Sequence, residues 1–437
     1  MKNIAVIGTG YVGLVSGAGI SDYGHNVVCA DIDKTKIEQL NLGEIPIYEP
    51  GLKELVQRNV KSDRLSFTDN VNEAIQNSDV IFIAVGTPEK IDGSSDLTAI
   101  YDVARAIGEN LNDYKVICTK STVPIGTGSK ITNIIMDVSH GENGFDYVSN
   151  PEFLREGSAV KDFLWPDRVI LGASGPKAIE IMQNVYRPLY INETPIIETT
   201  IETAELIKYA SNAFLSVKIS YINEIANMCD EIGADVHVVS KAMGIDGRIS
   251  SKFLHPGPGY GGSCFPKDTK SLLSMANEMG LELNVVKGAV DTNQMQKKRM
   301  AQKLLNLFDG DIKDKTIAVL GLAFKAQTDD IRESPSIEII NTLNNNGALV
   351  RAFDPVANKN MKKLFPDLKT CNSWEDAVKD ADGVVIMTEW NEFRGLDLLK
   401  LKDLLKSPIL LDCRNILRMD DLERFGFKYD NVGRKKR

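Results

Sequence analysis

The stretch GYGGSCFPKD, residues 259–268, places one cysteine where a reactive thiol is chemically feasible. Pro266 favours the first turn of a helix, which we expect to continue to Gly280. Cys264 would then lie at the N-terminus of that helix with Lys267 close by, and both features favour the thiolate. The alternative is a small apolar residue packed under a tight turn, because free cysteine is often buried.

Other polar side chains could serve the same chemistry. Lys208 and Asn212 are four residues apart in an apolar helical segment, so they share a face and require partners when buried. Together they could stabilise an oxyanion or satisfy a buried carboxylate. Glu152 and Glu156 lie in NPEFLREG, and Thr122 lies in KSTVPIGTG. Beside a nicotinamide, such groups predict oxidation of an alcohol to an aldehyde, its capture by a thiolate, and a second oxidation to a thioester that water cleaves.

A glycine-rich turn predicts the nicotinamide cofactor. GTGYVG, residues 8–13, follows a predicted strand and opens a predicted helix, so backbone amides there could approach a pyrophosphate. Asp31 ends the next predicted strand, where a carboxylate accepts hydrogen bonds from a ribose 2′-OH and repels a 2′-phosphate. The turn therefore favours NAD over NADP, although the nearby cations Lys34 and Lys36 weaken that preference. The alternative is a glycine-rich turn that binds no ligand.

Strand and helix signals alternate along both halves of the chain. NIAVIG, residues 3–8, begins a series that continues to RVILG, residues 168–172, which is typical of a doubly wound parallel sheet. TIAVLG, residues 316–321, resembles NIAVIG, and NNGALVRAFDP, residues 345–355, resembles DYGHNVVCADID, residues 22–33. Because the order is kept, we predict a duplicated nucleotide-binding fold.

The segment between the halves predicts one long helix. Residues 196–232 contain neither glycine nor proline, Thr199 with Glu202 forms a possible capping box, and Gly233 is a possible C-terminal stop. About thirty helical residues would span roughly 45 Å. We therefore expect an α/β protein with two Rossmann-like doubly wound parallel-sheet domains joined by a long central helix. The predicted domains are residues 1–198, which bind NAD, 199–300, a central helical and dimerisation region with the cysteine, and 311–437, which bind the substrate.

The second half lacks a GxGxxG turn, but cations follow its strands. Phe324, Lys325 and Arg332 follow the first strand of this half, and Arg414 follows a later one. An aromatic ring and cations at the carboxyl edge of a parallel sheet suit a phosphorylated ligand with a flat base. Ordinary surface charge is the alternative for each of these residues.

Composition excludes several classes of protein. The chain has 437 residues, enough for two or three domains, and its net charge of -9 argues against binding nucleic acid. Its six cysteines lie far apart and form no CxxC pair, which predicts no metal site and suits a reducing cytoplasm. No apolar stretch reaches membrane-spanning length, so we expect a cytoplasmic protein.

Motifs along nearly the whole chain resemble the UDP-glucose/GDP-mannose dehydrogenase family. They are GTGYVGL, PIYEPGL, VGTP, KSTVPIGTG, NPEFLREG, IKYASNAFL, GYGGSCFPKDT, GLAFK and DDIRES. The resemblance implies a four-electron oxidation of UDP-glucose to UDP-glucuronate by two NAD, through a thiohemiacetal and a thioester on Cys264. It also implies a homodimer formed through the long helix, with Arg248 reaching the sugar of the partner subunit.

The resemblance implies roles for residues at matching positions. Lys208 and Asn212 would stabilise the oxyanion, and the remaining proton transfers would fall to Asp268, Thr122, Glu152 and Glu156, whose division of labour stays open. The residues implied in NAD binding are Gly8, Gly10, Tyr11, Val12, Gly13, Asp31, Lys36, Thr87, Thr122, Glu156, Lys267 and Arg332. Those implied in substrate binding are Glu152, Phe153, Leu154, Lys208, Asn212, Arg248, Phe253, Gly261, Lys325 and Arg414.

Three alternatives remain for the activity. The substrate could be another nucleotide sugar, GDP-mannose or a UDP-N-acetyl sugar, although Ser263, Phe265 and Tyr260 fit the UDP-glucose branch of the family better. A two-electron dehydrogenase would use Lys208 and Asn212 with a structural cysteine. A non-catalytic NAD-binding scaffold is the third alternative. His255 stands where the family often has lysine, and we assign it no role.

Overall fold

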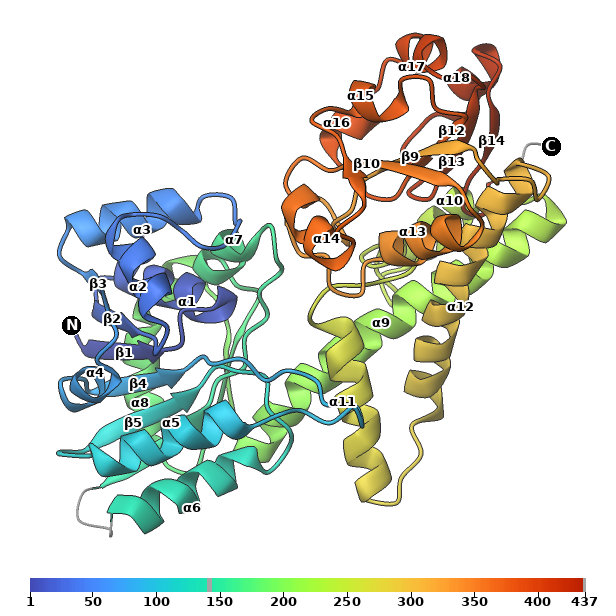
Figure 1. Cartoon of the computed structure of the whole chain (residues 1–437). Coiled ribbons are helices and arrows are strands. Elements are labelled where there is room, and N and C mark those ends of the chain that lie inside the picture. The colour runs from blue at the N-terminus through green and yellow to red at the C-terminus, as the bar shows by residue number, and fades with distance from the viewer. Residues whose placement is uncertain (140–143, 435–437) are drawn as a thin grey trace. The chain divides into compact units, whose positions relative to one another are not determined.

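The computed structural model describes residues 1–139 and 144–434. It divides into two compact units, Met1–Ser211 with Lys270–Gly280, and Asn212–Thr269 with Leu281–Arg437. The boundary passes through two helices, α9 (Ile201–Ile232) and α11 (Phe265–Glu278) (Figure 1). Within the described residues, no helix is both long enough and apolar enough to cross a membrane.

Eight strands form the sheet of the first unit. They are β1 (Asn3–Ile7), β2 (Asn26–Ala30), β3 (Leu65–Thr68), β4 (Val80–Ile83), β5 (Lys115–Thr119), β6 (Phe145–Ser149), β7 (Val169–Ala173) and β8 (Ile196–Thr199). Their order is β3-β2-β1-β4-β5-β6-β7-β8, and neighbouring strands are parallel except β6 and β7. Residues 150–168 connect these two strands and contain one six-residue helix, and the chain reverses its direction between them.

Helices cover both faces of this sheet (Figure 1). One face packs against α1 (Tyr11–Asp22), α2 (Lys34–Asn41), α3 (Leu52–Lys61), α7 (Ala159–Leu164) and α8 (Pro176–Val185), which precedes the short helix η1 (Arg187–Asn192). The other face packs against α4 (Val71–Gln76), α5 (Thr98–Glu109) and α6 (Thr127–Ser139).

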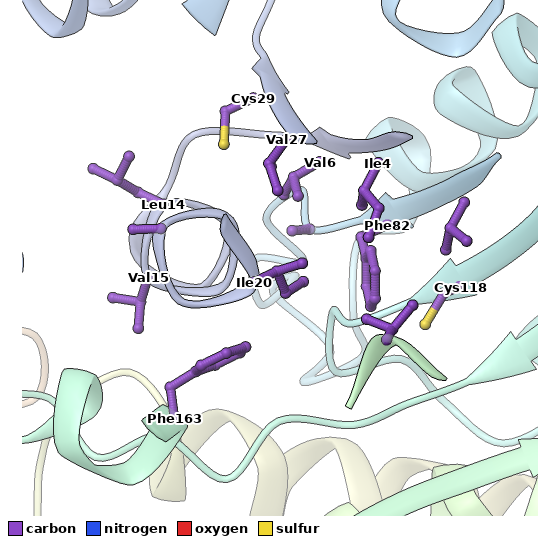
Figure 2. Packing of buried hydrophobic residues seen from close by; sticks show 14 of the residues in the cluster. Ile4, Val6, Leu14, Val15, Ile20, Val27, Cys29, Phe82, Cys118 and Phe163 are labelled. Carbon is purple, nitrogen blue, oxygen red and sulfur yellow. The ribbon is translucent and has the colours of Figure 1, made fainter. Parts of the chain in front are cut away.

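The core of the first unit surrounds α1 (Figure 2). Leu14, Val15 and Ile20 of this helix are fully buried, and Phe163 of α7 packs beside it. A Cβ added to Gly17 would lie 2.3 Å from the sulfur of Cys29 on β2, so the helix approaches the sheet too closely for a larger residue. This close packing fixes the glycine-rich turn at the start of α1.

Six strands form the sheet of the second unit, all of them parallel to their neighbours. They are β9 (Thr316–Leu320), β10 (Leu349–Phe353), β11 (Lys369–Thr370), β12 (Gly383–Ile386), β13 (Ile409–Asp412) and β14 (Lys428–Asp430). Their order is β11-β10-β9-β12-β13-β14. The remaining helices are α10 (Val236–Ile245), α12 (Asn284–Leu307), α13 (Pro335–Asn345), α14 (Asn358–Leu364), α15 (Trp374–Val378), α16 (Asn391–Arg394), α17 (Leu398–Leu404) and α18 (Met419–Arg424).

The two sheets repeat the same local geometry, which confirms the predicted fold class. Gly8 has φ +103° after β1, and Gly321 has φ +95° after β9. Their N–H groups donate to Ala30 and to Phe353, each the last residue of the following strand in its sheet. The left-handed conformation explains why glycine ends both NIAVIG and TIAVLG.

The predicted long helix is α9, with 32 residues, and its C-terminal stop at Gly233 has φ +72°. The predicted capping box at Thr199 is wrong, because residues 196–199 form β8. The cap is instead Thr200, whose Oγ1 accepts a hydrogen bond from the Thr203 N–H at 3.3 Å. The pairing of β8 with β7 excludes Thr199 from the helix.

The two sheets differ in the acidic residue that follows their second strand. Asp31 is half-buried, whereas Asp354 is completely buried. The Asp354 carboxylate accepts five hydrogen bonds, from the backbone N–H groups of residues 322, 323, 356 and 357 and from Trp390 Nε1. In the first sheet, the acidic residue at this position is suited to bind a ribose. In the second sheet, the equivalent Asp354 instead connects two loops and a tryptophan.

We expect the substitution Asp354→Asn to destabilise the second unit by about 2–4 kcal/mol, because the new amide places a donor against buried N–H donors. Thermal unfolding followed by calorimetry would show a lower transition temperature. Asp31→Asn is the matched control and should change the transition temperature much less, since Asp31 is partly exposed. Equal shifts for both variants would contradict the structural role of Asp354.

Candidate active site

The glycine-rich turn before α1 leaves backbone N–H groups accessible. Gly10 is the N-cap of α1 and no side chain caps this helix, while a Cβ added at Gly10 would meet no atom within 4 Å. A Cβ at Gly13 would lie 1.9 Å from the Gly8 oxygen, so only glycine fits there. Val12 is half-buried in the first turn of the helix. This arrangement offers the first-turn amides of α1 to an anion such as a pyrophosphate.

Asp31 lies beside this turn. Its Oδ2 accepts hydrogen bonds from Thr9 N and Thr9 Oγ1, both at 2.8 Å, and its Oδ1 accepts one from Asp33 N at 3.0 Å. Partial burial alone would raise the pKa of Asp31, but these hydrogen bonds outweigh burial and hold it below its usual value. Lys36 Nζ lies 4.0 Å from Asp31 and 3.7 Å from Asp33. An ionised acceptor beside a glycine turn fits the adenosine ribose of NAD.

A buried carboxylate that the sequence analysis did not single out connects the turn to NPEFLREG. Glu49 accepts hydrogen bonds from Gly157 N at 2.6 Å and Ala159 N at 2.7 Å, and also from the hydroxyl of Tyr11. Burial raises the pKa of Tyr11 strongly, with Glu49 and then Glu156 adding to the shift. Glu49 therefore holds the backbone next to Glu156 in place.

A buried ion pair occupies the carboxyl end of β6. Lys208 Nζ of α9 lies 2.9 Å from Glu152 Oε1 and donates to the Glu152 backbone oxygen at 2.7 Å. Their side chains are only 4% and 5% exposed. Glu152 Oε2 also accepts from Leu154 N at 2.5 Å, and the ring of Phe153 lies 5.4 Å from Lys208 Nζ. Two predicted catalytic residues are thus in direct contact.

Thr87 and Thr122 also meet at the carboxyl edge of the first sheet. Thr87 Oγ1 donates to the Thr122 backbone oxygen at 2.9 Å. The turn that follows is held by Glu205 of α9, whose carboxylate accepts from Gly126 N at 2.6 Å and Gly128 N at 2.8 Å. Burial raises the pKa of Glu205 to about 7, although these two hydrogen bonds oppose the shift.

Cys264 lies directly before α11, as the sequence predicted. It is half-buried, and its Sγ lies 3.6 Å from Ser263 Oγ. Its backbone oxygen accepts from the Asp268 N–H at 2.8 Å, which closes the first turn of the helix. The Asp268 carboxylate is 1% exposed, accepts from Asn212 Nδ2 at 2.6 Å and lies 2.8 Å from Lys267 Nζ. Cys264, Asp268, Asn212 and Lys267 therefore form one cluster in the second unit.

The glycines before Cys264 pack tightly on the segment after β9. A Cβ on Gly261 would lie 2.4 Å from the Glu333 oxygen, and a Cβ on Gly262 would lie 2.7 Å from the ring of Phe324. Gly262 N also donates to the Arg332 oxygen at 2.7 Å. These contacts explain the glycine pair, because any side chain there would push the two segments apart.

The predicted cations of the second unit have different environments. Arg414 donates to the backbone oxygens of Met387 and Phe324 at 2.7 and 2.6 Å, which places it at the carboxyl edge of the sheet. Lys325 Nζ lies 5.3 Å from the Phe324 ring centroid. Arg332 pairs with Asp330 and Arg248 pairs with Asp246, and both guanidinium groups are largely exposed.

One predicted substrate residue has a strained backbone. Phe253 has φ +63°, which is rare for a residue with a side chain. Its ring packs edge-on against the ring of Phe265 at a centroid distance of 6.1 Å, and Phe265 directly follows Cys264 in the sequence. Within the second unit, the strained residue is therefore linked to the start of α11.

The other five cysteines are buried and differ from Cys264. Burial raises the pKa of the Cys29 and Cys118 thiols to about 12, and it raises the pKa values of Cys229, Cys371 and Cys413 too. Neutral buried thiols are poor nucleophiles. Cys264 is therefore the candidate nucleophile of this chain.

The structure thus gathers the predicted residues into two groups, one in each unit. The first unit holds the glycine turn, Asp31, Thr87, Thr122, Glu152 and Lys208, and the second holds Asn212, Cys264 and Asp268 with the cations. Glu49 and Glu205 had only weak signals in the sequence: Glu49 lies in PIYEPGL, and Glu205 is an acidic residue in an apolar helix. Their partners are far away along the chain, so neither contact follows from local spacing.

Comparisons with known proteins agree along the whole chain. Models of the UDP-glucose/GDP-mannose dehydrogenase family match its NAD binding domain at residues 2–190, its central domain at 202–295 and its UDP binding domain at 318–419. UDP-glucose 6-dehydrogenase of Rhizobium meliloti is 50% identical over 434 residues, 99% of each chain.

Solved structures give the same result. A UDP-glucose dehydrogenase from Pyrobaculum islandicum is 36% identical with a TM-score of 0.92, covering 99% of this chain and 98% of that one. A UDP-D-ManNAc dehydrogenase from Pyrococcus horikoshii is 28% identical with a TM-score of 0.87, covering 99% of each chain.

Because burial raises the pKa of Glu205, we predict that the difference in stability between the wild type and Glu205→Gln depends on pH. Its pKa in the folded protein, about 7, lies above its ordinary value of 4.5, so its stabilising contribution is complete below pH 4.5 and is lost as the pH rises to about 7. The wild type should therefore lose on the order of 3 kcal/mol relative to the variant between these values. Urea unfolding of both proteins from pH 4.5 to 8 would measure this difference, and parallel pH profiles would contradict it.

Proposed function

The chain belongs to the UDP-glucose/GDP-mannose dehydrogenase family, and from this premise we propose that it oxidises UDP-glucose to UDP-glucuronate with two NAD. The observation that carries the proposal is the environment of Cys264. This thiol alone among the six is half-buried, it precedes the N-terminus of α11, and it adjoins a cluster of Asp268, Asn212 and Lys267. A nucleophilic cysteine distinguishes a four-electron oxidation from a two-electron one.

The proposed reaction has two oxidations and one hydrolysis. NAD, bound through the first-turn amides of α1 and Asp31, would supply the hydride acceptor for both oxidations. In the first oxidation, loss of a hydride from C6 and of the proton of its hydroxyl would give the aldehyde. The Cys264 thiolate would then attack the C6 aldehyde carbon, and protonation of the oxygen would give a thiohemiacetal. Loss of a hydride and a proton from this adduct gives a thioester, and water then cleaves the C–S bond to release UDP-glucuronate and the thiol.

We assign the remaining steps to the predicted polar residues. The Lys208 ammonium and the Asn212 amide would donate to the oxyanion that forms at C6. Glu152, which is in contact with Lys208, would accept a proton in this proposal, and Asp268 would hold the attacking water through its second oxygen. Thr122 and Glu156 remain candidates for the proton relay.

We assign substrate recognition to the residues that the resemblance implies. Lys325 and Arg414 would neutralise the diphosphate, and Phe253, Gly261, Phe153 and Leu154 would contact the UDP-sugar. Lys267 and Arg332 would contact NAD with Tyr11, Val12, Lys36 and Thr87. Residues 1–198, 199–300 and 311–437 remain the proposed NAD-binding, central and substrate-binding regions. We propose a cytoplasmic location, because the six widely spaced cysteines without a CxxC pair suit a reducing compartment.

We expect purified protein to release two NADH per UDP-glucose when the sugar is limiting and NAD is in excess. Cys264→Ala should lower UDP-glucuronate formation by at least about 1,000-fold, because the thioester cannot form. Absorbance of NADH together with chromatography of the sugar products measures both quantities. Cys371→Ala replaces a buried thiol and should keep the stoichiometry of two.

The outcomes separate the possible activities. One NADH per sugar, retained by Cys264→Ala, would indicate a two-electron dehydrogenase. Turnover of GDP-mannose or of a UDP-N-acetyl sugar in place of UDP-glucose would keep the mechanism and change the substrate. Tight NADH binding without turnover of any of these sugars would support the scaffold alternative.

We also propose a homodimer formed through α9. Phe214, Tyr221 and Met228 recur at intervals of seven residues on this helix and are 64%, 46% and 59% exposed. Val238 and Ile245 of α10 are similarly exposed at the same interval. Large apolar side chains at a heptad interval form a stripe that another helix can cover. A second copy of the chain would bury this stripe, and the resemblance assigns Arg248 to the sugar site of the partner subunit.

Met228→Glu should weaken the proposed dimer at least about 10-fold in Kd, because a carboxylate would be buried in an apolar contact. Sedimentation equilibrium over a range of protein concentrations measures the change. Leu399→Glu, on the exposed side of α17, is the control and should leave the mass unchanged. A wild-type monomer, or an unchanged Met228→Glu dimer, would contradict the proposal.

A further inference from the structure

Lys120 is a buried cation outside the set of residues assigned so far. It follows β5, and only 5% of the residue is exposed. Its ammonium donates to Asn150 Oδ1 at 3.1 Å and to Tyr186 Oη at 3.2 Å. It also lies 5.6 Å from the ring centroid of Tyr186 and 5.8 Å from that of Phe163. Neutral oxygens and aromatic faces therefore surround the charge.

This environment is an expensive one for a lysine. Burial lowers the pKa of Lys120 to about 8, while Cys118 and Glu152 act to raise it and Lys208 acts to lower it. Replacing a buried charge by an apolar residue of similar volume is often neutral or stabilising. Stability by itself therefore does not account for a lysine at this position.

The contacts of Lys120 lead to the ion pair described above. Asn150 Oδ1 accepts from both Lys120 and the Tyr186 hydroxyl, the latter at 2.6 Å, and Asn150 Nδ2 donates to the Ile170 oxygen at 2.8 Å. The Asn150 N–H donates to the Thr119 oxygen at 3.0 Å. Asn150 is therefore fixed by contacts to its backbone and its side chain, and Glu152 follows two residues later.

Lys120 is also coupled to this ion pair through its charge. Glu152 attracts the Lys120 ammonium and Lys208 repels it, so the three groups form one buried set, with Lys120 after β5, Glu152 after β6 and Lys208 on α9. All three belong to the first unit. A change of charge at Lys120 must therefore alter the electrostatic energy of the other two.

We propose that Lys120 is a positioning residue of the oxidation: through Asn150 it fixes the backbone of Glu152, and its positive charge acts on the neighbouring Glu152–Lys208 pair. The inference rests on the proposed function, in which Glu152 and Lys208 act on the substrate. It gives Lys120 no contact with the substrate.

Lys120→Met tests the proposal, with Lys115→Met as the matched control. Lys115 is a second buried lysine and is the first residue of β5, the strand that Lys120 follows, and its ammonium donates to the backbone oxygens of Gln76 and Ser78 at 3.0 and 2.7 Å. We expect Lys120→Met to lower kcat by about 10- to 100-fold with little change in KM, because the Glu152–Lys208 pair is misplaced while the proposed diphosphate contacts at Lys325 and Arg414 remain. Lys115→Met should keep kcat within about twofold.

The pH dependence of kcat distinguishes a positioning role from a simple loss of stability, which would not change that dependence. The ratio of wild-type to Lys120→Met kcat should be largest below pH 8 and should fall above it, because the wild-type ammonium loses its charge there. Tyr186→Phe removes one hydroxyl from Asn150 and keeps the aromatic ring. It should lower kcat by a smaller factor and without a change in KM, and it provides a test if Lys120→Met does not fold.

Three results would overturn the proposal. They are an unchanged kcat in Lys120→Met, equal losses in Lys115→Met and Lys120→Met, and, where Lys120→Met does not fold, an unchanged kcat in Tyr186→Phe. The wild type is assayed first with UDP-glucose, GDP-mannose and UDP-N-acetyl sugars, and the variants with the sugar that is oxidised. Wild-type turnover with unaltered variants would refute the role of Lys120 alone, whereas no wild-type turnover would refute the proposed function as well.

Discussion

The position of the candidate nucleophile, Cys264, depends on the contacts of the buried Asp268 carboxylate. The Asp268 side chain binds Asn212 of α9 and Lys267 of α11, and the Asp268 N–H group closes the first turn of α11 onto the Cys264 oxygen. A buried carboxylate is tolerated only when charge and hydrogen bonds compensate for its desolvation. Those requirements fix α9 and the start of α11 relative to each other within the second unit, and the position of Cys264 follows.

The duplicated fold shows how one architecture supports different recognition. Both sheets place a glycine of positive φ after the first strand and an acidic residue after the second. In the first sheet the acid is partly exposed beside a glycine turn, which suits a ribose. In the second sheet Asp354 is saturated by five internal hydrogen bonds, so the same position cannot accept a ribose. This difference is why we assign the UDP contacts to Arg414 and Lys325 instead, within residues 318–419, which match the UDP binding domain of the family.

Buried charges are concentrated at the carboxyl edge of the first sheet. Glu152, Lys208, Lys120 and Glu205 all lose most of their hydration, and burial shifts the pKa values of Lys120 and Glu205 toward neutrality. Such an arrangement costs folding energy and is typical of sites that move protons. The apolar faces of the sheet, packed around α1 and around α5 and α6, provide the stability that offsets this cost.

The sequence by itself determined the local features. Alternating strands and helices, the repeat of NIAVIG in TIAVLG, the stop at Gly233 and the helix beginning after Cys264 all follow from periodicity, glycine and proline over short distances. Those signals act between neighbouring residues and therefore remain readable in a single chain. The cap at Thr199 was predicted wrongly, because pairing with β7 extends β8 through that residue.

Only the tertiary structure decided which polar groups meet. Glu49 with Gly157, Glu205 with Gly126, and Lys120 with Asn150 and Tyr186 are separated by 30 to 108 residues along the chain. The antiparallel β6–β7 pair and the complete burial of Asp354 were equally hidden. Burial and hydrogen bonding depend on strand order and on helices packed across a sheet, and no local pattern encodes that geometry.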